Sequence, residues 1–355
     1  MSSLAKNVRV FARVKSGRAN AENEHKKERK AAAYQFYLGV DGGGTKCTIA
    51  LMNSSGRVVA EGAGGPANPL RVGVETAVSN IAYAIDKACD EHNISRGDIV
   101  AATLGLAGVR RHDIRERVRE SFLARFRVQR IVVTTDAEIA LYGTTFGEAG
   151  LVVIAGTGSI CLGVDAKGRR AMAGGWGPVA GDEGGGRGIA GEALHRIAKA
   201  SDGRGPQTSL SEQAAEYFRA SNVENLIGAI YAPTMDNSRI AGFSRFVTEA
   251  AKAGDAVAIE ILREAGEELG NAAVAVIKKL GLGKERFPVG CVGSVFLAGP
   301  LLTDSMSKLI HTHAPNAYLT KPKRSPAHAA CEIARTNGRI VEPMPGDDGP
   351  SLRKN

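Results

Sequence analysis

Two glycine-rich turns, each set between apolar strands, constrain this chain more than any other feature. The first lies in YLGVDGGGTKCTIAL, residues 37–51, and the second in LVVIAGTGSICLGV, residues 151–164. Glycines in such a turn let main-chain N–H groups approach a phosphate without side-chain obstruction. This unit of strand, glycine turn and strand recurs about 115 residues further along the chain. The sequence therefore predicts two similar α/β halves, each beginning with a strand, a turn and a second strand.

Length and composition agree with two lobes. A chain of 355 residues exceeds one average domain, and 44 glycines with only 5% aromatic residues suit tightly turned α/β packing. Apolar periodicity predicts further strands at residues 57–60, 99–106, 130–134 and 289–292. It also predicts helices at residues 74–93, 112–125, from 136 onward, 187–200, 211–220, 238–253, 255–280, 301–314 and 327–336.

The net charge of +9 is concentrated at the N-terminus. Residues 1–33 hold nine basic and three acidic side chains, which is six of the nine net charges, so the rest of the chain gives no sign of nucleic-acid binding. We therefore expect a disordered basic extension at 1–33, an N-terminal lobe at 34–148 and a C-terminal lobe at 149–324. A helix within 325–340 is expected to pack back on the N-terminal lobe, followed by a flexible tail at 341–355.

The remaining composition favours a cytoplasmic protein. No run of 18 apolar residues could span a membrane, and the N-terminus has no apolar core of a secretory signal. The five cysteines are odd in number and widely spaced, which suits free thiols in a reducing compartment and no zinc or iron–sulfur site.

The side chains around the turns suit Mg-ATP. Asp41 ends an apolar strand, where its carboxylate can hold a hydrated Mg²⁺, and Thr45 and Lys46 can donate to phosphoryl oxygens. One glycine turn alone could be a hairpin without a ligand. Two such turns can clamp the β- and γ-phosphates from both sides, and neither turn matches the P-loop or Rossmann pattern.

The order of five motifs resembles a known superfamily. GVDGGGTK, TTDAEIAL, VVIAGTGSI, GGWGPVAGDEGGG and CVGSVFLAGPLL, between residues 37 and 336, resemble the phosphate, connecting and adenosine motifs of actin-like sugar kinases. The resemblance is narrower to the N-acetylglucosamine kinase and BadF/BadG/BcrA/BcrD-type ATPase family. It implies two ribonuclease-H-like lobes with an ATP cleft between them, and transfer of the γ-phosphate to an amino sugar, first of all the 6-hydroxyl of N-acetylglucosamine.

The same resemblance implies roles for individual residues. Those expected to bind Mg-ATP are Asp41, Gly42, Gly43, Gly44, Thr45, Lys46, Thr135, Gly156, Thr157, Gly158, Gly293 and Ser294, with Asp41 as the metal ligand. Those expected to bind the sugar are Asn68, Gly175, Trp176, Gly177, Asp182 and Glu183. Asn68 has a simpler alternative role, an Asx turn before Pro69.

The general base departs from the pattern of the relatives. In GLAGVRRHD this chain has Arg110 where many relatives carry an aspartate, and a guanidinium cannot accept the sugar proton. Asp113, three residues on, or Asp136, at the end of a predicted strand, could replace it. Asp136 could instead be only the N-cap of the helix that follows.

Two other functions stay open at the level of sequence. One is a BadF-like activator of a dehydratase, whose relatives need cysteines for an iron–sulfur cluster. The other is a catalytically weak sugar or nucleotide sensor, suggested by Arg110. The expected partner is a small-molecule sugar, with N-acetylglucosamine, glucosamine, muramic acid and glucose not distinguished, and a homodimer is left open.

Overall fold

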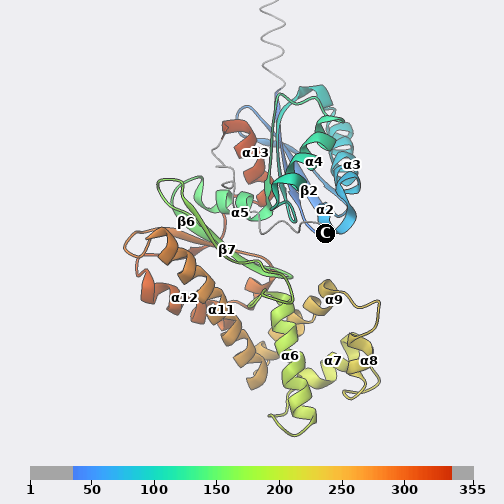
Figure 1. Cartoon of the computed structure of the whole chain (residues 1–355), viewed down its shortest axis with the longest axis vertical. Coiled ribbons are helices and arrows are strands. Elements are labelled where there is room, and N and C mark those ends of the chain that lie inside the picture. Colours follow the sequence, from blue (N-terminus) through green and yellow to red (C-terminus); the bar gives the residue numbers. More distant parts are fainter. Residues whose placement is uncertain (1–34, 338–355) are drawn as a thin grey trace, which may run out of the picture. The chain divides into compact units, whose positions relative to one another are not determined.

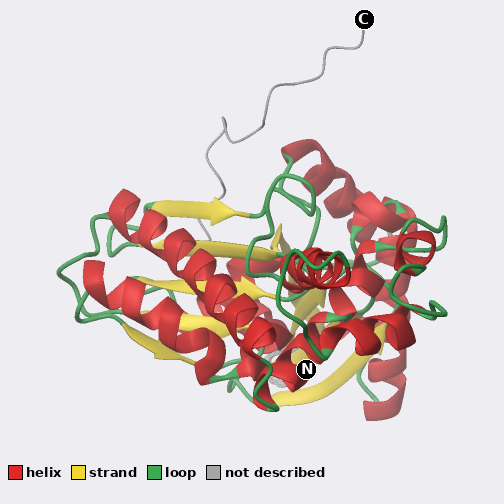
Figure 2. Ribbon diagram, turned by 90° about the horizontal axis from the view of Figure 1, so that it is seen from below, coloured by secondary structure: helices red, strands yellow, loops and turns green. Residues whose placement is uncertain are grey.

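The computed structural model describes residues 35–337, which form two compact units. One unit comprises residues 35–134 and 330–337, and the other residues 135–329. The expected N-terminal extension (1–33) and the tail (341–355) lie outside the described residues. Each unit is a sheet covered by helices on both faces (Figures 1 and 2).

The first unit is built on a five-stranded sheet in the order β3-β2-β1-β4-β5. Strand β1 pairs antiparallel with β2 and parallel with β4. The strands are β1 (Phe36–Gly42), β2 (Cys47–Asn53), β3 (Val58–Gly64), β4 (Ile99–Leu106) and β5 (Arg130–Thr135). The helices are α2 (Pro69–Val72), α3 (Val74–His92), the short 3-10 helix η1 (Arg96–Asp98), α4 (His112–Leu123) and the last part of α13 (Pro326–Thr336).

Alternation along β1 and β2 explains why this sheet has two covered faces. Leu38 and Val40 are fully buried in one cluster with residues of α3 and α4. On the opposite face, the Cys331 thiol of α13 donates to the Ala50 carbonyl at 3.1 Å. Figure 1 shows α3 and α4 on one side of the strands and α13 on the other.

The second unit repeats the topology of the first. Its sheet has the order β10-β9-β6-β7-β8. In each sheet the first strand lies at the centre, the antiparallel second and third strands extend the sheet on one side, and the fourth and fifth strands extend it on the other. The strands are β6 (Gly150–Ala155), β7 (Ser159–Val164), β8 (Arg170–Gly174), β9 (Pro288–Val292) and β10 (Tyr318–Thr320). The expectation of two α/β lobes with matching openings is confirmed.

The helices of this unit divide between the two faces of its sheet. Leu151 and Val153 point into the larger core with α6, α10, α11 and α12, whereas Val152 packs against α5. The helices are α5 (Asp136–Thr145), α6 (Gly186–Ser201), α7 (Leu210–Phe218), α8 (Leu226–Ile230), α9 (Asn237–Gly242), α10 (Ser244–Lys252), α11 (Ala256–Leu280), the 3-10 helix η2 (Ser294–Ala298) and α12 (Pro300–His313).

One predicted helix is wrong in detail. Residues 238–253 form two helices, α9 and α10, which meet at the fully buried Phe243. The Tyr217 hydroxyl donates to the Arg239 carbonyl at 2.8 Å and lies against Gly242, where a side chain would collide with it. The break therefore follows from tertiary packing against α7.

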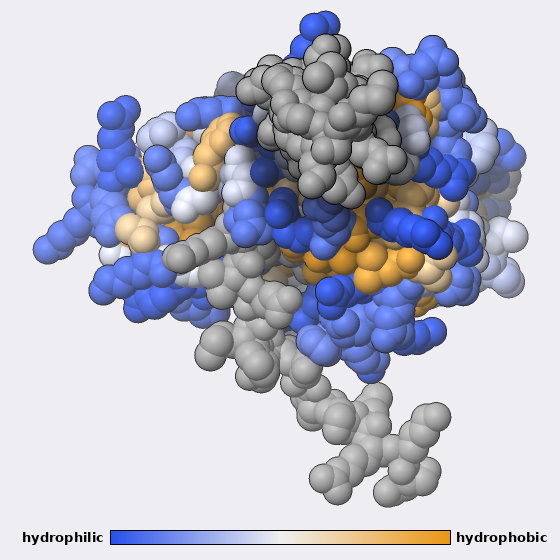
Figure 3. Space-filling view, turned by 90° about the horizontal axis from the view of Figure 1, so that it is seen from above, coloured by the Kyte–Doolittle hydropathy of each residue, from blue (hydrophilic) through white to orange (hydrophobic). Residues whose placement is uncertain are grey.

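The cysteines are free thiols, and most of them are buried. Cys47, Cys89, Cys161 and Cys331 are buried, and Cys291 is partly exposed. Within residues 35–337, no helix combines the length and apolarity needed to cross a bilayer. On the face drawn in Figure 3, hydrophilic side chains surround a smaller apolar area.

Candidate functional site

The first glycine turn joins β1 to β2 and leaves open space where a ligand could approach. The Gly43 N–H donates to the Lys46 carbonyl at 2.9 Å. A Cβ on Gly43 would meet only the Lys46 carbonyl, at 3.5 Å, which is ordinary contact. Gly42 is different, because a Cβ there would collide with Leu106. Thr45 and Lys46 are exposed, and Asp41 is half-buried at the end of β1.

Two other segments are hydrogen-bonded to this turn. The Ala67 N–H donates to the Gly43 carbonyl at 2.9 Å, and the Ala107 N–H donates to the Gly42 carbonyl at 2.8 Å. The residues that follow, Asn68 and Gly108, touch each other, since a Cβ on Gly108 would collide with the Asn68 side-chain oxygen. The predicted phosphate turn and the predicted sugar ligand Asn68 therefore lie close together in the first unit.

Asn68 does serve as a helix cap. Its Oδ1 accepts a hydrogen bond from the Leu70 N–H at 2.9 Å, which begins α2. The cap fixes the orientation of the side chain and leaves the amide nitrogen Nδ2 to donate. The capping role and a role toward a sugar hydroxyl are compatible in this geometry.

A buried arginine, Arg115, donates hydrogen bonds to the loop that contains Arg110. Arg115, 9% exposed, donates to the carbonyls of Val109 and Arg110, at 3.3 and 2.6 Å. Asp113 is exposed in the first turn of α4, where both its oxygens accept from Arg111, at 3.0 and 2.8 Å. The Arg110 side chain is exposed.

Arg71 is a residue that the sequence did not single out. A Cβ on Gly44 would come within 2.8 Å of its Nη1 and 3.2 Å of its Cδ, so the guanidinium lies over the first glycine turn. Arginine there adds positive charge beside Lys46, in a form suited to phosphate oxygens. No local motif marks it, because it reaches the turn only through the path of α2.

Asp136 is the first residue of α5 and is not its cap. The cap is Thr135, whose Oγ1 accepts from the Glu138 N–H at 3.2 Å. The Asp136 Oδ1 accepts from the adjacent Ala137 N–H at 2.9 Å. Burial raises the pKa of Asp136 above its ordinary value, and these backbone N–H groups only partly offset that rise.

The second glycine turn, Gly156–Gly158, is fastened to the start of α6. The Gly186 N–H donates to the Gly156 carbonyl at 2.7 Å, and the Arg187 N–H donates to the Thr157 carbonyl at 2.8 Å. A Cβ on Gly185 would lie 2.6 Å from the Gly158 backbone. A Cβ on Gly156 would meet nothing within 4 Å. Glycines are thus required at residues 184–186 for close packing. The three consecutive glycines in GDEGGG could have indicated this packing from the sequence.

Asp182 packs directly beneath this second turn. Its Oδ1 accepts from the Ser159 N–H at 3.3 Å, and a Cβ on Gly158 would lie 2.5 Å from its carboxylate. The residue is 9% exposed and adopts a left-handed backbone with φ of +65°. Glu183, next along, is exposed, and its carbonyl accepts from the Ser159 hydroxyl at 2.6 Å.

The predicted sugar loop follows β8 and reaches the same place. Gly174, Gly175 and Gly177 have φ values of +78°, +72° and +84°, which favour glycine. The Gly175 N–H donates to the Ser159 carbonyl at 3.0 Å. Trp176 is 72% exposed, so its indole is presented to solvent or to a ligand.

Gly293, predicted near adenosine, also adjoins the second turn. It has φ of +114°, and a Cβ would collide with the Ala155 carbonyl just before Gly156. Gly293 and Ser294, at the start of η2, are both exposed. Only glycine fits this position, because of its backbone conformation and its close packing against Ala155.

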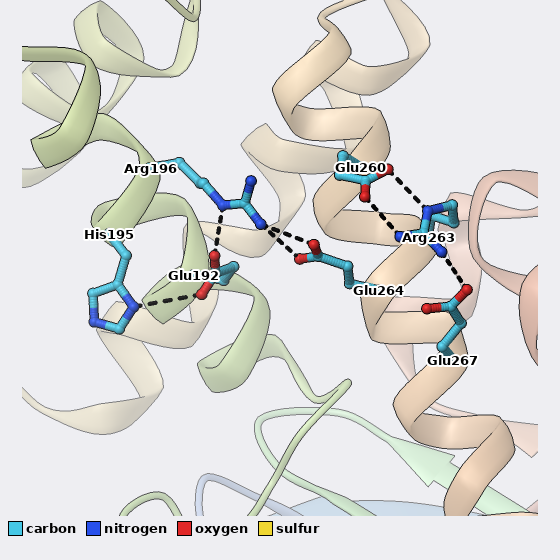
Figure 4. A network of polar contacts seen from close by, with 7 residues as sticks. All are labelled: Glu192, His195, Arg196, Glu260, Arg263, Glu264 and Glu267. Atoms are coloured by element: carbon cyan, nitrogen blue, oxygen red, sulfur yellow. Dashed lines mark hydrogen bonds and ion pairs between the residues drawn. The ribbon is translucent and has the colours of Figure 1, made fainter. Parts of the chain in front are cut away.

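Helix α6, whose first residues pack against the turn, is linked to α11 by an ion pair of Arg196. Arg196 donates to Glu192 on α6 at 2.6 Å and to both oxygens of Glu264 on α11 at 2.8 and 3.0 Å (Figure 4). His195 also lies 3.5 Å from Glu192. These contacts are partly exposed, so the ion pair of Arg196 with Glu264 stabilises the pairing of α6 with α11 by about 1 kcal/mol at most.

Most of the predicted site residues outside β5 and α5 form one group in each unit. The first unit brings together Asp41, Gly42, Gly43, Gly44, Thr45, Lys46 and Asn68, whereas Asp113 lies in the first turn of α4, paired with Arg111. The second brings together Gly156, Thr157, Gly158, Gly175, Gly177, Asp182 and Gly293. Open turns with unobstructed backbone, and carboxylates as hard oxygen donors, fit a nucleotide phosphate with Mg²⁺.

Known proteins resemble the chain over most of its length. An N-acetylmuramic acid/N-acetylglucosamine kinase of Clostridium acetobutylicum is 30% identical over 302 residues, covering 85% of this chain and 99% of that protein. An N-acetyl-D-glucosamine kinase of Dictyostelium discoideum is 32% identical over 320 residues, covering 84% and 98%.

Solved structures agree on the fold. An N-acetylglucosamine kinase-like protein of Chromobacterium violaceum superimposes with a TM-score of 0.70 at 26% identity, covering 84% of this chain and 99% of that one. A ROK family glucokinase of Streptomyces griseus, solved with glucose and AMPPNP, has a TM-score of 0.54 at 19% identity, covering 84% and 99%. Residues 38–331 match the BadF/BadG/BcrA/BcrD ATPase family. The chain belongs to the BadF/BadG/BcrA/BcrD ATPase family.

Proposed function

We propose that this protein is an ATP-dependent kinase that phosphorylates an amino sugar, with N-acetylglucosamine as the first candidate and its 6-hydroxyl as the acceptor. One observation carries the proposal. Each unit has a glycine turn at the same place in the same sheet topology, and at each turn one glycine, Gly43 or Gly156, faces space that a side chain would fill.

The Gly43 and Gly156 N–H groups donate to the carbonyls of Lys46 and Gly158 within the turns. The other backbone N–H groups of the two turns bind the phosphates of ATP, aided by Lys46, Thr45 and Arg71. Asp41 holds Mg²⁺, which when bound neutralises charge on the phosphates. Beside the second turn, the exposed Gly293 and Ser294 leave room for adenosine. The Clostridium acetobutylicum and Dictyostelium discoideum relatives are both N-acetylglucosamine kinases, which supports an amino sugar as the acceptor.

The sugar is oriented by Asn68 in the first unit and by Gly175, Trp176, Gly177, Asp182 and Glu183 in the second. Asp136 accepts the proton of the attacking sugar hydroxyl. The hydroxyl oxygen forms a bond to the γ-phosphorus while the bond between the γ-phosphorus and the ADP oxygen breaks. The raised pKa of Asp136 favours this role, because a base works best when its pKa is near the working pH.

The test is ADP release measured over a panel of N-acetylglucosamine, glucosamine, N-acetylmuramic acid and glucose, with ATP and MgCl₂. Phosphorus–proton NMR of the product identifies the phosphorylated oxygen. A mock preparation from cells that carry the empty expression vector is the control against contaminating kinases. Turnover with none of these sugars would reject the proposal, and turnover equal in both preparations would assign it to a contaminant.

A further inference from the structure

Helix α5 carries Asp136 as its first residue, so the contacts that hold the start of α5 also set the position of that carboxylate. The C-terminal half of α5 is held by backbone contacts. The Gly143 carbonyl accepts from the N–H groups of Lys323 and Arg324, at 3.0 and 3.3 Å, and a Cβ on Gly143 would lie 2.9 Å from the Arg324 carbonyl oxygen. All of these residues belong to the second unit.

One face of α5 is incompletely packed. A cavity of about 210 Å³ lies between this face and the turn from β7 to β8, within the second unit. On α5 it is lined by Glu138, Leu141, Tyr142 and Thr145, which follow the helical repeat. Close packing resists the movement of a helix, and that resistance is missing over this face. The first turn of α5 therefore needs another contact to fix it.

An ion pair links the two walls of this cavity. Arg170, the first residue of β8, donates from Nη1 to Oε2 of Glu138, and both residues line the cavity. The side chains are 19% and 8% exposed. Burial lowers the pKa of the Arg170 guanidinium, and its buried Nε has no hydrogen-bond partner among the residues that the structure describes. A charge pair so far withdrawn from water is strongly destabilised when one member is removed.

The pair is connected to Asp136 through the backbone. The Glu138 N–H donates to Thr135 Oγ1 at 3.2 Å, and Asp136 Oδ1 accepts from the Ala137 N–H at 2.9 Å. The carboxylates of Asp136 and Glu138 thus belong to one hydrogen-bonded turn. Without Arg170, Glu138 would be a buried carboxylate with no compensating charge, and a shift of this turn toward the cavity would return it to water. The same shift would displace Asp136.

We propose that Arg170 and Glu138 are positioning residues, whose ion pair anchors the first turn of α5 to β8 and so holds the Asp136 carboxylate where it can accept the proton of the sugar hydroxyl. The inference rests on the proposed function, in which Asp136 is the base. A misplacement of about 1 Å can lower a rate by about 10²-fold, so loss of the pair should act mainly on kcat.

The experiment compares Arg170→Met with the wild type in steady-state turnover of the panel sugar of highest activity, over a range of pH, with a thermal melt of each protein. At neutral pH, kcat should fall by at least about tenfold, while the KM values for sugar and ATP change less than about threefold.

The acid limb of kcat/KM provides a readout that a loss of stability alone would not move. Burial raises the pKa of Asp136 and backbone N–H groups oppose the rise, whereas the charges of Arg170 and Glu138 do not contribute to it. A displaced first turn would lose part of the packing that excludes water from Asp136. The pKa should then fall toward its ordinary value, and the acid limb should move to lower pH in Arg170→Met.

Two variants test whether Arg170 acts through Glu138. Arg170→Lys keeps a cation that can pair with Glu138 and should recover most of the lost kcat. The double variant Glu138→Met/Arg170→Met removes both charges, leaves no uncompensated carboxylate, and should be more active than Arg170→Met. If the melt shows that Arg170→Met does not fold, Glu138→Gln replaces it. Glutamine still accepts from Arg170 but carries no charge, so both changes are expected at a smaller size.

The matched control is Arg169→Met. Arg169 precedes Arg170 in the sequence and also forms an ion pair, with Asp165 at 2.6 Å, but this pair lies within the β7–β8 hairpin and does not reach α5. Arg169→Met should keep the wild-type kcat and the wild-type acid limb.

The outcomes separate the inference from the function. A folded Arg170→Met, or Glu138→Gln in its place, with the wild-type kcat overturns the inference, and so does a lowered kcat with an unmoved acid limb. A double variant as impaired as Arg170→Met would also overturn it, and in each of these cases the kinase proposal stands. If Asp136→Ala keeps the wild-type kcat, the inference falls with the assignment of the base. If the wild type phosphorylates no sugar, the kinase proposal itself fails, and the inference with it.

Discussion

The Thr135 hydroxyl, and not the Asp136 carboxylate, caps helix α5, accepting the Glu138 N–H at 3.2 Å. This removes the simplest structural explanation for Asp136, which could have been present only as the cap. The carboxylate lies just after β5, where its Oδ1 accepts a hydrogen bond from the Ala137 N–H. Replacing it should therefore affect chemistry more than helix stability.

Asp136→Ala should lower kcat by about 10²- to 10⁴-fold with little change in the KM for sugar, the usual effect of removing a positioned base. Steady-state kinetics and a thermal melt measure the two effects. Asp113→Ala is the control: its carboxylate is exposed and paired with Arg111, so its loss should be nearly silent. If the two variants exchange phenotypes, Asp113 is the base.

The pKa of Asp136 predicts a pH dependence. Burial raises it above the ordinary 3.8, so kcat/KM should fall on the acid side at a pH above 3.8. Because the folded state binds the proton more tightly, stability falls as pH rises from 3.8 through the folded pKa. Asp136→Asn should accordingly gain in melting temperature over wild type as pH rises, and equal shifts at every pH would contradict the assignment.

Gly43→Ala and Gly156→Ala test the two turns. The added methyl group meets no close neighbour at either position, so folding should be unaffected. Because the methyl group occupies space that a phosphate would need, kcat/KM for ATP should fall by at least about tenfold. Gly228→Ala, in α8 and equally uncrowded, is the control and should be active and slightly more stable. Full activity of both turn variants would remove the phosphate assignment.

Arg110 separates an active enzyme from a weak sensor. Arg110→Asp restores the carboxylate found in many relatives, on a loop that Arg115 already holds in place. A large gain in kcat would show that the natural chain is catalytically impaired. We expect a loss instead, because the proposed base is Asp136 and a second carboxylate would repel the phosphates.

Arg71→Ala should raise the KM for ATP by about tenfold, since a guanidinium over Gly44 is removed from the phosphate turn. Arg71→Lys should recover only part of the affinity, because lysine keeps the charge but loses the planar fork. An unchanged KM for ATP in both variants would limit Arg71 to a packing role.

The sequence predicted what depends on local pattern. Short apolar runs located β1 and β6, and the glycines that follow them located both turns. It did not predict contacts set by distant segments. The position of Asp182 under Gly158 depends on a left-handed backbone 24 residues along the chain, and the break at Phe243 depends on Tyr217 from another helix.

The burial of the thiols has a practical consequence. Burial raises the pKa of Cys161 and Cys331, and that of the partly exposed Cys291 to about 11, so little reactive thiolate forms at neutral pH. A cysteine introduced at an exposed position, such as Ser54 in one unit or Ser221 in the other, would react with a maleimide probe far faster than the native thiols. The natural chain is thus a ready host for paired fluorescent or spin labels that report how the two halves respond to sugar and nucleotide.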